Sequence, residues 1–323
     1  MRKSVKSILK IVIPLLLGAI LVWYSFHRIS FSDLSFYFKN INFMWVCFGA
    51  ILGFLSHFSR AYRWKYMVEP LGYELRISNS IMAVFSGYLI NYTIPRAGEI
   101  SRATIISNYE KIPFEKGMGT IVAERVADVI VMILIISGTL LWKFDIIYDF
   151  LCSNLKFNSK LLLLCIALIL IVFIFFNAIK NSNHRLFKKL RSLFKGFMEG
   201  LLSIFIMKKK WAFLAHTLFI WLMYVLMFYF TSFSIPQTSG LNFFIILIGF
   251  IAASFSVAAT NGGIGAYPLA VYAAFSIFDI PEAPSLAFGW IMWVSHTLLI
   301  VIVGGISLLL LPIYNRLYPK NRS

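Results

Sequence analysis

The run LAFGWIMWVSHTLLIVIVGGISLLLL, residues 286–311, contains no aspartate, glutamate, lysine or arginine. A helix needs about 20 consecutive apolar residues to cross the hydrocarbon core of a bilayer, because each residue advances it by about 1.5 Å. The run therefore predicts a membrane-spanning helix near the end of the chain.

Five further apolar runs of similar length precede it, at about 8–26, 43–60, 119–142, 160–179 and 211–232. Hydrophobic residues make up 60% of the 323-residue chain and charged residues 13%, against roughly 25% charged in an average soluble domain. No polar stretch is long enough for a separate soluble domain, so we treat 1–323 as a single transmembrane domain. The predicted fold class is an all-α polytopic integral membrane protein with about six full spans.

Two other apolar stretches are interrupted. Residues 77–94 end at Ile94-Pro95-Arg96-Ala97-Gly98-Glu99, and residues 241–278 break at Thr260-Asn261-Gly262-Gly263-Ile264-Gly265. Non-helical backbone at membrane depth is stable only where protein or a wet cavity supplies hydrogen-bond partners. We therefore predict two re-entrant helix pairs. Short full spans in their place, giving eight or more spans, are an alternative that charge placement does not separate.

Lysine and arginine lie mostly on one side of these predicted spans. With the N-terminus in the cytoplasm and both breaks re-entrant, 24 of them fall inside and five outside, while Arg125 lies within a span. This split follows the positive-inside rule and predicts that both termini are cytoplasmic. The formal charge of +17 lies beside apolar runs, so it indicates contact with anionic lipid headgroups and not with nucleic acid.

The order of the predicted elements repeats once along the chain. Residues 1–145 give span, span, re-entrant pair and span, and residues 155–312 give the same order with the opposite orientation. An inverted repeat with interrupted helices at matching positions indicates a transport site near the bilayer midplane. The competing interpretation is that proline and glycine only kink packed helices. Within the second repeat, 184–210 has apolar residues at helical spacing opposite basic ones, which predicts an amphipathic helix on the cytoplasmic leaflet.

Ionisable residues gather in two short segments of this apolar chain. Glu99 lies between Arg96 and Arg102, and the span 119–142 contains the run Glu124-Arg125-Val126-Ala127-Asp128. An isolated charge at the centre of a span costs about 2.5–3.5 kcal/mol, so these groups must pair, contact water or lie near the interface. Arg125 can reach Asp128 at i,i+3, which leaves Glu124 to pair with Arg96 or Arg102. Either a structural salt-bridge network or a site for a substrate headgroup fits this pattern.

These motifs resemble a known family. Pro95-Arg96-Ala97-Gly98-Glu99 with Arg102, followed by Glu124-Arg125 and Asp128, is similar to the transmembrane domain of lysylphosphatidylglycerol synthases, which includes the flippase half of multiple peptide resistance factors. Gly262-Gly263-Ile264-Gly265 is similar to the family's Pro-Gly-Gly-x-Gly element. The resemblance covers the chain in span order. Two positions depart from the pattern, because Asn261 stands where the family usually has proline and Pro268 where an acid often follows.

The resemblance implies a lipid flippase or transporter in the bacterial cytoplasmic membrane. It would move a phospholipid or a lipid-linked headgroup between leaflets, with anionic phospholipids as partners. The residues implied to bind the substrate are Arg96, Glu99, Arg102, Glu124, Arg125, Asp128, Gly262, Gly263 and Gly265. Two alternatives remain open. One is an ion- or proton-coupled transporter of a small polar solute, and the other is a non-catalytic membrane partner of a lipid-modifying enzyme. A homo-oligomer is compatible with each of these.

We expect neither enzymatic activity nor a cofactor. The chain has no phosphate-binding loop of the form G-x-x-x-x-G-K-[ST], no nucleophile beside a base, and no cysteine spacing typical of a metal site. It ends eleven residues past Pro312, whereas the family's soluble aminoacyl-transferring domain would need several hundred. His57, His216 and His296 each lie singly in an apolar run, and we interpret them as packed or interfacial residues, with a proton path as the alternative.

Overall fold

The computed structural model describes residues 16–29, 31–94, 96–142 and 207–320, and no strand occurs among them. The chain divides into two compact units, Met1–Ile121 with Met207–Ser323, and Val122–Ile206. The first unit holds both helix breaks, whereas the second is described only over 122–142. The predicted all-helical fold is confirmed for the described part of the chain.

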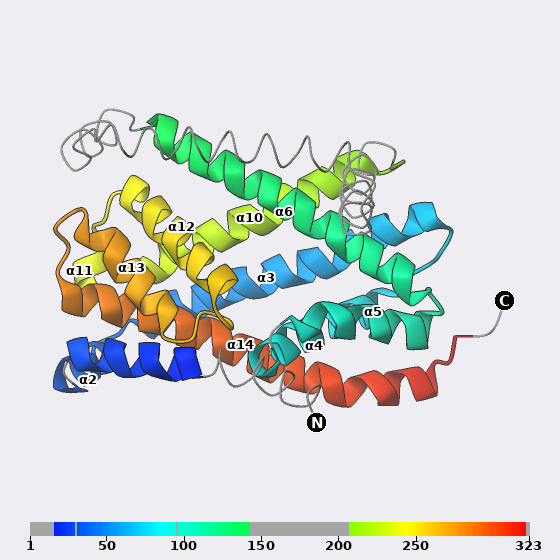
Figure 1. Ribbon diagram of the computed structural model, residues 1–323, viewed down its shortest axis with the longest axis horizontal. Helices are drawn as coiled ribbons and strands as arrows, with labels where there is room; N and C mark the ends of the chain where they lie inside the picture. Colours follow the sequence, from blue (N-terminus) through cyan, green and yellow to red (C-terminus); the bar gives the residue numbers. More distant parts are fainter. Residues whose placement is uncertain (1–15, 30, 95, 143–206, 321–323) are drawn as a thin grey trace, which may run out of the picture. The chain divides into compact units, whose positions relative to one another are not determined.

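The helices follow the chain in the order drawn in Figure 1, after a helical segment at residues 16–28. They are α2 (Phe31–Lys39), α3 (Phe43–Val68), α4 (Ile77–Thr93), α5 (Ala97–Glu110), α6 (Phe114–Trp142), α10 (Lys210–Ser232), α11 (Pro236–Ser239), α12 (Phe243–Ala259), α13 (Ala266–Ser276) and α14 (Glu282–Leu317), with a 3-10 turn at Glu69–Leu71. The sequence runs did not predict the short helices α2 and α11.

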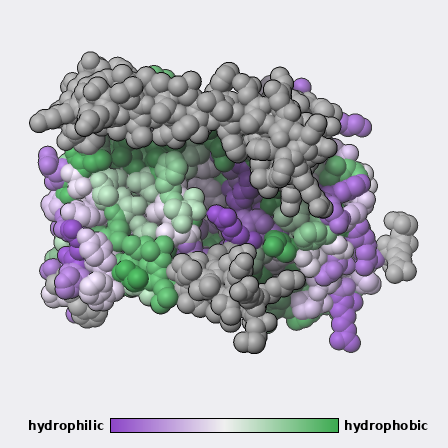
Figure 2. Space-filling view, in the orientation of Figure 1, coloured by the Kyte–Doolittle hydropathy of each residue, from purple (hydrophilic) through white to green (hydrophobic). Residues whose placement is uncertain are grey.

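Three of the described helices are long and apolar enough to cross a membrane: α3 with its following turn, α10 and α14. They carry large hydrophobic side chains on their outer faces, as Leu218, Leu298 and Leu309 illustrate, each more than half exposed. In Figure 2 hydrophobic residues cover much of the visible face, while hydrophilic ones gather toward the two ends of its long axis and in one group between them. An outward apolar surface of this kind fits lipid as the solvent.

The two interrupted stretches form helix hairpins, α4 with α5 and α12 with α13 (Figure 1). The four helices have 17, 14, 17 and 11 residues, fewer than the roughly 20 that a straight crossing needs. Pro95 cannot donate a backbone hydrogen bond, and Arg96 after it adopts a left-handed conformation with φ of 61°, so α4 cannot continue into α5. The predicted interruptions are therefore confirmed, while their re-entrant nature stays a prediction.

Helix α14 contacts both hairpins. Its Gly289 packs on Pro268 of α13 and its Gly304 packs on Phe85 of α4, so closely that an added Cβ would lie 2.5 Å from Pro268 Cα and 2.8 Å from the Phe85 carbonyl oxygen. Glycine is required at both places because the neighbours are backbone atoms, which no rotamer change can move. Helices α3 and α10 pack along each other beside this core.

Two sequence boundaries need correction. The apolar run ended at residue 60, but α3 continues to Val68, so Arg60 and Arg63 lie buried on a helix and not in a cytoplasmic segment. Likewise α14 is 36 residues long and exceeds the predicted run at both ends. The predicted span at 160–179 and most of the amphipathic helix at 184–210 lie outside the described residues.

Candidate functional site

The tips of the two hairpins meet. Tyr92 lies in the last turn of α4, and its carbonyl oxygen accepts a hydrogen bond of 3.0 Å from Nδ2 of Asn261 in the second break. Gly262 follows with φ of 65°, and a Cβ there would lie 2.6 Å from Cε1 of the Tyr92 ring. The two interruptions, 169 residues apart in sequence, thus form one junction.

One turn of α14 holds both sides of this junction. Nε1 of Trp293 donates to the Gly262 carbonyl oxygen at 2.8 Å, which satisfies a backbone group that the break leaves outside any helix. The Thr297 hydroxyl donates to Oη of Tyr92 at 3.3 Å. Polar contacts therefore replace the helical hydrogen bonds lost at the junction, as irregular backbone at membrane depth requires.

The glycines of the second break shape a turn that only glycine adopts easily. Gly262, Gly263 and Gly265 have φ of 65°, 77° and 67°, which confirms the predicted break at these residues. Gly265 also lies against the helical segment at residues 16–28. A Cβ at Gly265 would come within 2.5 Å of the Val22 nitrogen.

The first motif is built around a close crossing of α4 and α5. Gly98 lies against the carbonyl oxygen of Gly87, and its N–H donates to Oδ1 of Asn91 at 2.7 Å. Nδ2 of the same Asn91 lies 3.5 Å from Oε2 of Glu99. Arg96 is exposed at the N-cap of α5. Asn91 therefore links the break to the acid of the motif, a role that the sequence did not reveal.

Buried arginines form a second feature of the site. Arg102 is 2% exposed, and its guanidinium carbon lies 4.4 Å from the centre of the Trp64 ring, a cation–π contact between α5 and α3. On α3, Arg60 and Arg63 are also buried, and Nη1 of Arg63 donates to Oγ1 of Thr217 at 2.8 Å. Sequence reasoning missed both because the charge count placed them in a loop. Their i,i+3 spacing at the end of an apolar run was the signal that the helix continues.

The other predicted site residues lie on the part of α6 that belongs to the second unit. Nη1 of Arg125 and Oδ2 of Asp128 are 3.8 Å apart, which confirms the predicted i,i+3 pair, and Glu124 is buried. The pairing of Glu124 with Arg96 or Arg102 stays a prediction.

The histidines correct the sequence analysis. His57 on α3 and His296 on α14 are not single, because their Nε2 atoms are 3.1 Å apart, and Nδ1 of His57 is 3.3 Å from Oη of Tyr224. His216 is separate from this pair and makes a hydrogen bond of 2.8 Å with Ser59. The pair was missed because its members are 239 residues apart, and nothing in the sequence around either histidine predicts contact with the other.

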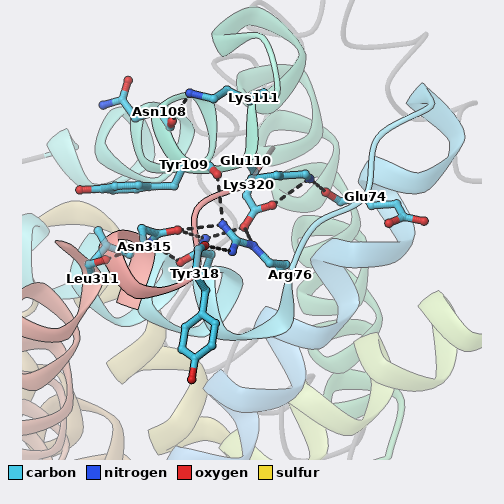
Figure 3. A network of polar contacts seen from close by, with 11 residues as sticks. Glu74, Arg76, Asn108, Tyr109, Glu110, Lys111, Leu311, Asn315, Tyr318 and Lys320 are labelled. Carbon is cyan, nitrogen blue, oxygen red and sulfur yellow. Dashed lines mark hydrogen bonds and ion pairs between the residues drawn. The ribbon is translucent and has the colours of Figure 1, made fainter. Parts of the chain in front are cut away.

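A polar network at the other end of the first hairpin fixes α4 and α5 to the end of α14 (Figure 3). Glu110 is fully buried and accepts from Nε of Arg76 at 2.8 Å, from Nζ of Lys320 at 2.9 Å and from Nδ2 of Asn79 at 2.5 Å. Asn315 of α14 exchanges hydrogen bonds with Asn79. The network anchors the hairpin at its open end and leaves the tip to the junction.

Residues 11–304 match the family of the lysylphosphatidylglycerol synthase TM region. The chain belongs to this family. It is also 35% identical over 92 residues to a UPF0104 membrane protein of Methanocaldococcus jannaschii, a match that covers 28% of this chain and 27% of that protein. The chain thus spans about a quarter of the length of that curated relative. No solved structure matches this chain.

Proposed function

We propose that this protein transports a lipid between the leaflets of the bacterial cytoplasmic membrane. The observation that carries the proposal is the junction of the two hairpin tips. In transporters built from inverted repeats, interrupted helices meet at the midplane and form the substrate site. Here Tyr92, Asn261 and Gly262 join the tips of the two hairpins, and α14 contacts both hairpins, which supports this proposal.

The buried arginines support an anionic headgroup as the part that is recognised. A guanidinium binds phosphate with two parallel hydrogen bonds, and it stays charged in a site of low dielectric. Arg102 lies on the same hairpin as Tyr92 and Arg96, so movement of a headgroup along α5 would pass from the exposed Arg96 to the buried Arg102. Glu99, on the same helix, would orient these cations. Neither a catalytic step nor a cofactor is part of this proposal.

The alternative of a non-transporting membrane partner lacks such an observation, because a scaffold has no need of strained backbone. Arg96, a non-glycine residue in the left-handed region at one of the two meeting breaks, is a costly feature of the kind that clusters at functional sites. A small polar solute as the substrate is the other alternative, and the same transport assay distinguishes it by testing lipid directly.

We expect Gly262→Ala to lower lipid transport at least tenfold. The added methyl group would meet the Tyr92 ring and would sit on a backbone with φ of 65°, so the junction must open or shift. Transport is measured in vesicles of phosphatidylethanolamine and phosphatidylglycerol that contain tail-labelled phosphatidylglycerol, by the fraction that dithionite quenches from outside. Gly305→Ala on α14 is the control, since a Cβ there meets no atom within 4 Å. Full transport by Gly262→Ala would contradict a transport role for the junction and would leave it as a packing contact between the two hairpins.

The proposed orientation has its own test. With both termini in the cytoplasm, α11 lies outside and the end of α5 lies inside. A cysteine at the exposed Gln237 should react with an impermeant maleimide added to whole cells, and one at the exposed Asn108 should react only after lysis. Both are made after the three native cysteines are replaced by serine. The reverse labelling pattern would contradict the orientation that the positive-inside rule predicts.

A further inference from the structure

His57 and His296 form a chain of hydrogen bonds with Tyr224 that neutral groups can satisfy in either of two directions. A neutral imidazole carries one N–H and one acceptor nitrogen. If the Tyr224 hydroxyl donates to Nδ1 of His57, then His57 carries its hydrogen on Nε2 and donates it across the 3.1 Å gap to Nε2 of His296. A proton arriving at Nδ1 of His57 can therefore be passed on, because His57 releases its Nε2 proton to His296 as it accepts the new one.

The pair can hold one added proton and no more. An imidazolium donates to a neutral imidazole, so a singly protonated pair keeps its hydrogen bond. A second proton would place two N–H groups of two cations face to face at 3.1 Å, which like-charge repulsion forbids in a buried site. The distance between the two Nε2 atoms thus limits the pair to one added proton.

Among the described helices, those packed on α3 around His57 each face the pair with an aromatic or titratable group. Tyr88 of α4 lies 4.6 Å from the His57 ring, Tyr224 of α10 lies 5.8 Å away, and His296 comes from α14. Aromatic faces stabilise a cation, whereas burial away from water and, to a smaller extent, Arg60 one turn further along α3 disfavour a cation at His57. The proton affinity therefore depends on the spacing of these helices.

Two of these helices, α4 and α14, also hold the hairpin junction, about one helical turn from the pair. On α14, His296 lies between Trp293, which binds the Gly262 carbonyl oxygen, and Thr297, which binds Tyr92. On α4, Tyr88 lies one turn before Tyr92. The pair and the junction therefore share α14 and lie about one helical turn apart along it.

We propose that the His57–His296 pair binds one proton in each transport cycle and couples lipid movement to the proton gradient. The proton enters from water on one side, is held between the two Nε2 atoms, and returns to water on the other side. This inference rests on the proposed lipid transport and adds its energy source.

The first test uses the vesicles described above, with a gradient of one pH unit and the membrane potential clamped at zero. Coupling to one proton corresponds to 1.36 kcal/mol per pH unit, so the leaflet ratio of labelled phosphatidylglycerol should change by up to about tenfold. A hundredfold change would mean two protons and would overturn the one-proton site. His57→Gln and His296→Gln keep a hydrogen-bonding side chain and should equalise the leaflets at every gradient. His216→Gln, outside the pair, should behave as the wild type.

A second measurement does not depend on transport. Between pH 8 and pH 3 the purified protein should take up one proton more than the double variant His57→Gln/His296→Gln, with a matching imidazolium band in the infrared difference spectrum, and His216→Gln should not lose that band. If a glutamine variant fails to fold, Tyr224→Phe keeps the packing, removes only the hydroxyl, and should slow proton uptake several-fold.

The outcomes separate the two proposals. Two results would overturn the proton site without contradicting lipid transport. One is a leaflet ratio that does not depend on the pH gradient, and the other is a dependence on the gradient that persists in both glutamine variants. Absence of lipid transport at any pH would contradict the proposed function. In that case the titration alone decides, and equal proton uptake by the wild type and the double variant would also reject the proton site.

Discussion

Replacement of Glu110 by glutamine is expected to destabilise the protein by about 3–5 kcal/mol. The carboxylate is fully buried and accepts hydrogen bonds from Arg76 and Lys320 (Figure 3). It also accepts one from Asn79. Glutamine has nearly the same shape but no charge, so two cations that are about three-quarters buried would lose the anion that balances them. The free energy of unfolding in detergent micelles, from denaturant titration followed by circular dichroism, measures this loss.

The matched control is Glu69→Gln. Glu69 pairs with Lys209 at 2.9 Å, but both side chains are about half exposed, and exposed ion pairs contribute little. The hydrogen bond to Glu69 raises the pKa of Lys209. The two sites differ in burial, since the Glu110 side chain is fully buried and both partners of the Glu69 pair are about half exposed. Equal stability changes in the two variants would mean that the Glu110 network is solvated, and that it does not anchor the first hairpin.

Long apolar periodicity was the part of the fold that the sequence could predict. The run 211–232 matches α10 within one residue, and 77–94 matches α4 within one residue. The ends of α3 and α14 were harder, because a hydropathy pattern stops at the first charge, whereas a helix continues wherever its polar side chains find partners. Arg63, held by Thr217 and the Phe213 ring, is such a case.

The candidate site was predictable where backbone chemistry is local. Proline and glycine predict a helix break from the sequence alone, so Gly262, Gly263 and Gly265 were identified from their spacing and from the family resemblance. What each break contacts is not local information. Tyr92 looked like any aromatic residue near the end of an apolar run, and Glu110 looked like a surface acid. Tyr92 acquires its role from Asn261, 169 positions away. Glu110 acquires its role from Arg76 and Asn79, 34 and 31 positions away, and from Lys320, 210 positions away.

Asn261 illustrates how a departure from a family pattern can be read once the partner is known. Proline at this position would present no hydrogen-bond donor, whereas the asparagine amide donates to the Tyr92 carbonyl oxygen. This chain therefore has a side-chain hydrogen bond between its two hairpin tips that the usual family residue could not make. Pro268 has a structural role as well, because Gly289 of α14 packs against it.

The second large effect is expected for Gly98→Ala, which should destabilise the protein by about 3 kcal/mol, at the upper end for overpacking. An added Cβ would overlap the carbonyl oxygen of Gly87, a backbone atom that cannot rotate away, so α4 and α5 would have to separate. Separation would also strain the hydrogen bond from Gly98 N–H to Asn91, at the turn that presents Arg96 and Glu99.

Gly119→Ala on α6 is the control for this substitution. A Cβ at Gly119 meets no atom within 4 Å, so alanine should leave the stability unchanged or raise it by up to about 1 kcal/mol through its greater helix propensity. Both variants are compared by denaturant titration in the same micelles, together with the Gly262→Ala transport assay. Because Gly98 sets the helix crossing behind the tip, Gly98→Ala should lower transport as well as stability. Loss of stability without loss of transport would separate the crossing from the junction, and would place the working part of the site in the second hairpin alone.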